Sequence, residues 1–102
     1  LANGYYRVSP TVIATASVKG DEVFAELITN LSESNIVNAP QSVAMKIYGS
    51  CSLRQYTRWG MVFFSDQWKG GFPMMQFEAD NINRRAERGG PIAAVFDKEC
   101  AK

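Results

Sequence analysis

Apolar and polar side chains alternate along the middle of the chain, over residues 43–53. The odd positions of this stretch carry Val43, Met45, Ile47, Gly49, Cys51 and Leu53, and the even positions carry Ala44, Lys46, Tyr48, Ser50, Ser52 and Arg54. A period of two is typical of a β-strand with one buried side and one solvent-facing side. The pattern therefore predicts that Cys51 faces the core and that Lys46, Tyr48 and Arg54 face solvent.

Several further stretches have the composition of strands. A second β-prone run, over residues 55–65, follows the central strand directly. Shorter β-prone runs cover residues 5–8, 11–18, 23–29 and 72–79, and turn or loop sequences separate them at residues 19–22, 30–41 and 66–71. Because only a short turn joins the runs 11–18 and 23–29, these two are expected to form an antiparallel pair.

The last residues of the chain have the spacing of a helix. Pro91 suits a first helical position. The apolar residues that follow it at helical intervals are Ile92, Val95, Phe96 and Cys100. We expect this stripe to pack on the odd-position side of the central strand, so Cys100 faces the sheet.

Residues 80–90 are the most charged segment. They fit either a short helix, which would begin at Asp80 and end at Gly89, or a mobile arm. The whole pattern predicts one domain, residues 1–102, of the α+β class. Its expected architecture is an antiparallel β-sheet with a C-terminal α-helix packed on one face.

The two cysteines allow two interpretations. They are 49 positions apart, and the chain has no histidine to complete a zinc site with them. One interpretation is a pair of free thiols in the core of a cytosolic protein. The other is a disulfide between Cys51 and Cys100 in an exported protein, and it is favoured because both residues lie on apolar faces. Closing a loop of this size contributes about 3–4 kcal/mol on the loop-entropy description.

Composition and charge exclude several classes of function. The chain of 102 residues is 46% hydrophobic and carries a net charge of +1. Without histidine, a Ser-His-Asp triad, a Cys-His pair and a histidine metal ligand are excluded, and no phosphate-binding glycine motif is present. Glu78 and Asp80 are interpreted as solvated charges at a strand end rather than as a glycosidase pair. We therefore expect no enzyme activity, no cofactor and no metal site.

No apolar run reaches 18 residues, so we expect no membrane-spanning helix. Any export signal would already have been removed from this chain.

Basic and aromatic side chains interleave on the solvent side of the two central strands. Residues of these types are frequent at protein interfaces, and the predicted partner-binding set is Lys46, Tyr48, Arg54, Tyr56 and Arg58. The same interleaving serves single-stranded nucleic acid, but the near-neutral charge and the expected disulfide argue against a nucleic-acid partner. A secondary basic patch is predicted at Arg84, Arg85 and Arg88, within residues 46–90, which hold seven basic and four acidic side chains. The two tryptophans, Trp59 and Trp68, are expected to pack in the core or at its rim.

A spaced set of residues resembles a known family. The residues that carry the likeness are Gly4-Tyr5-Tyr6-Arg7-Val8, the run 23–29, Ser42-Val43, Lys46-Ile47, Cys51, Tyr56, Phe63-Phe64, Asp66, Trp68, Gly70 and Cys100. In this order they are similar to the surface-adhesin protein E family of small exported Gram-negative bacterial proteins. The resemblance implies a helix tied to an antiparallel sheet by one disulfide, binding of host matrix and serum proteins, and a homodimer. It also implies that the strand region leading through Cys51 takes part in binding.

Two features depart from that family's pattern. The founding adhesin is a lipoprotein, whereas this chain has no N-terminal cysteine, and residues 83–90 resemble an insertion ahead of the helix. The resulting functional hypothesis is an exported, adhesin-like surface or periplasmic protein that binds a protein partner. The alternative hypothesis is a periplasmic inhibitor or immunity protein that blocks a partner enzyme.

Overall fold

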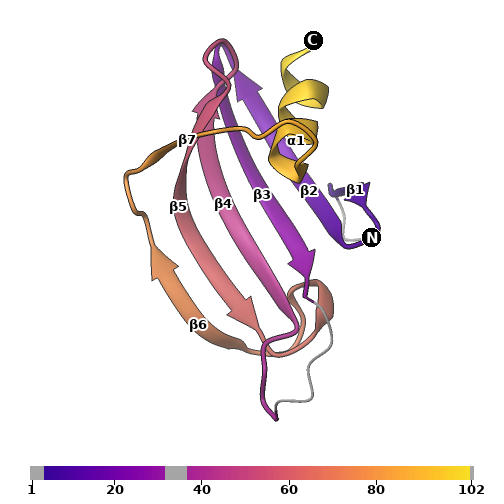
Figure 1. Ribbon diagram of the computed structural model, residues 1–102. Coiled ribbons are helices and arrows are strands. Elements are labelled where there is room, and N and C mark those ends of the chain that lie inside the picture. Colours follow the sequence, from indigo (N-terminus) through magenta and orange to yellow (C-terminus); the bar gives the residue numbers. More distant parts are fainter. Residues whose placement is uncertain (1–3, 32–36, 102) are drawn as a thin grey trace.

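A computed structural model describes residues 4–31 and 37–101. Its elements are β1 (Tyr6–Ser9), β2 (Val12–Lys19), β3 (Glu22–Asn30), β4 (Ser42–Ser50), β5 (Gln55–Phe64), the 3-10 helix η1 (Gln67–Lys69), β6 (Pro73–Glu78), β7 (Asn83–Arg85) and α1 (Pro91–Cys100). The first six strands form an antiparallel sheet in sequence order, and β7 pairs with β5 (Figure 1). The loop expected over residues 30–41 includes residues 32–36, which lie outside the described residues.

The hydrophobic core lies between α1 and one face of the sheet. Phe96 and Val95 are fully buried and pack with apolar side chains of the strands, which are Val12, Ala14, Val23, Ala25, Leu27 and Ile47. The apolar stripe expected from helical spacing is therefore confirmed. The helix contacts β1, β2 and β3 and makes no contact with β5 or β6, which lie at the other side of the sheet (Figure 1).

A disulfide joins the helix to the sheet, as the sequence predicted. Cys51, just after β4, is bonded to Cys100 at the end of α1, and their Cα atoms are 5.6 Å apart. This separation lies within the usual range for a disulfide. The antiparallel sheet with a C-terminal helix tied by one disulfide is thus confirmed.

The turn between β2 and β3 is fastened to the turn between β4 and β5. Gly20 adopts a φ of +63°, which suits the tight turn there. Next to it, Asp21 accepts hydrogen bonds from the Ser50 hydroxyl and from the Ser52 N–H at 2.9 Å, and these bonds lower the pKa of its carboxyl. The Asp21 carbonyl also accepts a bond from the Cys51 N–H at 2.8 Å. The chain on either side of the disulfide is therefore held in place.

The expectation of a helix or a mobile arm over residues 80–90 was wrong. Residues 83–85 form β7, which pairs antiparallel with the first half of β5 through Tyr56 and Arg84. The Ala86 N–H then donates to the Arg54 carbonyl at 2.9 Å. Strand β6 pairs only with the second half of β5. β6 thus leaves the first half of β5 without a partner on this side. Residues 83–85 of the charged segment pair with that half before the chain continues to α1.

Candidate functional site

The face of the sheet opposite α1, here called the open face, presents a group of large side chains. Phe24, Tyr48 and Trp59 are 43%, 45% and 46% exposed. The rings of Phe24 and Tyr48 stack with centroids 6.2 Å apart, and the Lys46 Nζ lies 5.1 Å from the centroid of the Trp59 ring. We call Phe24, Lys46, Tyr48 and Trp59 the aromatic patch. It presents three rings and one cation on strands β3, β4 and β5.

A buried carboxylate lies beside the aromatic patch. Glu26 is only 9% exposed, and it borders both shallow cavities that flank Lys46 and Trp59, which measure about 340 and 500 Å³. It accepts a hydrogen bond from the Tyr5 hydroxyl and forms an ion pair with Lys69 at 3.2 Å. Burial, followed by the Glu26 hydrogen bond, raises the pKa of Tyr5 to about 12. The carboxylate is thus satisfied within the protein and holds the N-terminal segment and η1 on the open face.

The structure divides the predicted partner-binding residues between the two faces. Residues directly opposite each other in a pair of strands project to the same side. Tyr48 lies opposite Thr57 on the open face, whereas Tyr56 and Arg58 lie opposite Gly49 and Ile47 on the helix side. The prediction that all five residues share one face was therefore wrong. The connection of residues 51–54 changes the parity, so even positions at the end of β4 share a face with odd positions of β5 over residues 55–57.

Trp59 shows why sequence reasoning missed part of the aromatic patch. A β-bulge between β4 and β5 places Lys46 opposite Gly60 and Ile47 opposite Arg58, which leaves Trp59 as the extra residue. The side chain of Trp59 therefore lies on the open face, exposed, rather than in the core. Trp68, by contrast, packs against the small open-face cluster of Ile13, Ile28 and Ala44, as expected.

The second candidate site is a groove on the helix side, with a volume of about 930 Å³. Its lining residues are Ser52, Leu53, Arg54, Tyr56, Arg84, Arg85, Ala86, Glu87, Arg88, Gly89, Ala93 and Asp97. We call it the arginine groove, because four of these residues are arginines. It brings Arg54 and Tyr56 of the predicted partner-binding set together with all three residues of the predicted secondary basic patch. Two residues of the first predicted site and all of the second thus meet in one place.

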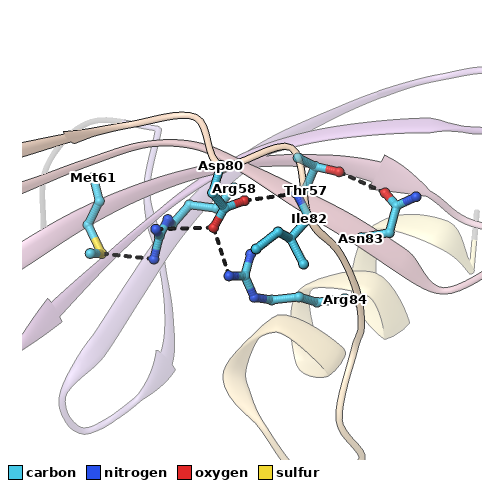
Figure 2. A network of polar contacts seen from close by, with 7 residues as sticks. All are labelled: Thr57, Arg58, Met61, Asp80, Ile82, Asn83 and Arg84. Atoms are coloured by element: carbon cyan, nitrogen blue, oxygen red, sulfur yellow. Dashed lines mark hydrogen bonds and ion pairs between the residues drawn. The ribbon is translucent and has the colours of Figure 1, made fainter.

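An ion-pair network lies beside this groove and fixes its neighbouring strand (Figure 2). The Asp80 carboxylate contacts Arg84 at 2.7 Å and Arg58 at 3.1 Å, and its other oxygen accepts a bond from the Ile82 N–H at 3.1 Å. The hydrogen bond from Arg84, followed by that from Ile82, lowers the pKa of Asp80 to about 2. Arg58 is therefore committed to holding residues 80–84 on β5.

The groove also contains a residue in an uncommon backbone conformation. Arg54 has a φ of +52°, in the left-handed region that residues other than glycine seldom adopt. Its guanidinium forms an ion pair with Asp97 of α1 at 2.9 Å and lies 5.9 Å from the centroid of the Phe96 ring. Such conformations cluster at functional sites.

The described ranges contain neither a cluster of potential metal ligands nor a helix that could span a membrane. Residues 4–31 and 37–101 contain no group of three or more potential His, Cys, Asp or Glu metal ligands. In the same residues, no helix is both long and apolar enough to cross a membrane.

Neither a protein-family model nor a curated protein sequence matches the chain. Solved structures of protein E from Haemophilus influenzae do match it. Crystal form II has a TM-score of 0.78 at 14% identity, and the match covers 99% of this chain and 90% of that chain. A second structure has a TM-score of 0.75 at 14% identity, covering 99% and 86%. Protein E from a non-typeable strain has a TM-score of 0.68 at 14% identity, covering 99% and 78%. The likeness to the surface-adhesin protein E family is thus confirmed, as a likeness of fold.

Proposed function

We propose that this chain is an exported, adhesin-like binding protein that contacts a host matrix or serum protein through its aromatic patch. The observation that carries the proposal is the exposure of three aromatic rings and Lys46 on neighbouring strands of the open face. The protein E fold and the disulfide support it, since disulfides persist in the oxidising compartments that exported proteins occupy.

The chemistry of the patch suits a protein surface. Tyrosine and tryptophan contribute large contact areas at a small cost in side-chain entropy, and they are frequent at the centres of interfaces. The strands that carry them are paired on both sides, so the rings are held in place before binding. Lys46, close to the Trp59 ring, adds a charge that can pair with a partner's carboxylate.

Substitutions in the patch test this proposal. We expect Tyr48→Ala and Trp59→Ala each to weaken binding to an immobilised matrix or serum protein by at least about 1 kcal/mol, because each removes a ring from the contact. Partners are first captured by the parent protein from host matrix extract, from serum and, in parallel, from bacterial periplasm. The affinities of the parent and the variants for each captured partner are then measured by surface plasmon resonance. Ile82→Ala is the matched control, since Ile82 is an exposed apolar residue away from the patch.

Two outcomes would contradict the proposal. Unchanged affinity in both ring variants would remove the aromatic patch from the interface. A partner captured only from periplasm would favour the inhibitor or immunity protein instead.

A further inference from the structure

The arginine groove has an excess of positive charge. Four arginines line it, against two carboxylates, Glu87 and Asp97. Asp97 is paired with Arg54, and Arg84 is paired with Asp80 outside the lining. Arg88 is exposed and makes no ion pair with any residue in the described ranges. The groove therefore offers more donors than the protein itself uses.

The start of α1 adds to this potential. Gly90 provides no side-chain cap, and the first turn of the helix contains no acidic residue. Ala93, in that first turn, lines the groove. The N-terminal end of a helix carries a partial positive charge from its unpaired N–H groups. The helix end and the arginines thus favour an anion at the same place.

The lining is mixed rather than purely charged. Leu53 is largely exposed at the rim, and Tyr56, Ala86 and Ala93 contribute apolar atoms. The volume of about 930 Å³ lies near the upper end of the roughly 300–1,000 Å³ that accept a drug-sized ligand. A single inorganic anion is too small to contact both walls of such a space. A sulfated sugar chain offers no apolar side chains to Leu53 and Tyr56.

The groove is also held in shape before any ligand arrives. One wall, residues 52–54, follows Cys51 of the disulfide and is bonded to Asp21. Another wall, residues 86–89, follows β7, which the Asp80 network fixes to β5 (Figure 2). A preformed site loses less conformational entropy on binding.

We propose that the arginine groove binds an acidic segment of a partner protein, with Asp or Glu carboxylates on the arginine side chains and an apolar side chain against Leu53 and Tyr56. Guanidinium groups suit this role because they donate two parallel hydrogen bonds to one carboxylate. The site is on the opposite side of the sheet from the aromatic patch. Its occupancy is therefore independent of the proposed function.

A peptide titration tests the inference on the intact, oxidised protein. The probe is a short synthetic peptide in which Glu and Leu alternate with Ser, and its matched control carries Gln in place of Glu. Calorimetry at low and physiological salt should detect binding of the Glu peptide, with affinity falling as salt rises. The Gln peptide should bind at least about tenfold more weakly, the equivalent of one lost charge-assisted contact.

Charge variants locate the site. Arg88→Glu should weaken binding of the Glu peptide by at least about tenfold. Lys19→Glu makes the same change of charge at an exposed position outside the groove, and it should leave the affinity for this peptide within about twofold of the parent's. Asp97→Asn should tighten binding severalfold, because it releases Arg54 and removes a repelling carboxylate.

Each remaining outcome overturns the inference. Equal binding of the Glu and Gln peptides would mean that carboxylates are not recognised. Equal losses in Arg88→Glu and Lys19→Glu would mean that only overall charge matters. Displacement of the peptide by inorganic phosphate or by heparin at lower concentration than by free Glu peptide would assign the groove to a small anion or to a polyanionic sugar.

Discussion

At the scale of single residues, Asp80 shows how one carboxylate positions a whole segment. It binds two arginines, Arg58 of β5 and Arg84 of β7, and accepts a backbone bond from Ile82. Residues 80–84 lack the apolar alternation that fixes other strands of this sheet. Their attachment therefore depends on this network, together with the bond from Thr57 to Asn83 at 2.8 Å (Figure 2).

The lowered pKa of Asp80 predicts a pH dependence of stability. Its pKa falls from 3.8 to about 2 in the folded protein. The ionised carboxylate therefore stabilises the fold above about pH 4, and this contribution is lost as the pH falls through about 2. Asp80→Asn should lower the melting temperature at pH 7, and its difference from the parent should shrink between about pH 4 and pH 2.

Melting curves of both proteins over this pH range provide the measurement. Asp66→Asn is the control, because Asp66 is an exposed carboxylate without an ion pair among the described residues. A difference between Asp80→Asn and the parent that is unchanged at pH 2 would show that the charge on Asp80 is not what stabilises the segment.

At the scale of elements, α1 is stable because its buried stripe meets the sheet and its end is covalently attached. A helix of ten residues is marginal in water by itself. Burial of Phe96 and Val95 against β2 and β3, together with the disulfide at Cys100, supplies the stability that the isolated helix lacks.

Phe96→Ala tests the contribution of this packing. We expect a loss of about 3–5 kcal/mol in the free energy of unfolding, because the aromatic ring is fully buried and its removal leaves a cavity. Urea denaturation of the oxidised protein measures it. Ala94→Ser, on the exposed side of the same helix, should change the stability by less than about 0.5 kcal/mol. Equal stabilities of the two variants would contradict the packing described for α1.

At the scale of the whole molecule, the sheet ends in an edge strand that carries exposed apolar side chains. β6 pairs with β5 on one side and has no strand on its other side among the described residues. Met75 and Phe77 project from it, each nearly half exposed, and Phe77 meets Phe63 edge to face at 6.0 Å. Native proteins usually protect such edges with charges, cover or a partner strand.

We therefore expect a homodimer in which β6 of two copies pair antiparallel, which would satisfy the edge N–H and C=O groups and cover Met75 and Phe77. Sedimentation equilibrium should find a dimer in the parent protein. Phe77→Lys should shift it to monomer by placing a charge in the contact. Phe72→Lys, an exposed position just before the strand, should not. A parent protein that sediments as a monomer at every concentration would contradict this assembly.

The sequence by itself determined those features that depend on local periodicity. The alternation around Ile47 predicted β4, and the spacing of Ile92, Val95 and Phe96 predicted α1 and the side it buries. Together these two patterns predicted the Cys51–Cys100 disulfide, because each placed one cysteine on an inward face. The resemblance to the protein E family predicted the same fold.

Only the tertiary structure decided which side chains of different strands share a surface. The connection of residues 51–54 moves Tyr56 to the opposite face from Tyr48, and the bulge moves Trp59 out of the core. β7 exists because β6 leaves half of β5 unpaired, which no periodicity in residues 83–85 signals. The aromatic patch and the arginine groove both depend on such pairings. Register is set by turn length, bulges and vacant edges across the whole sheet, so it could not be obtained from any single stretch of sequence.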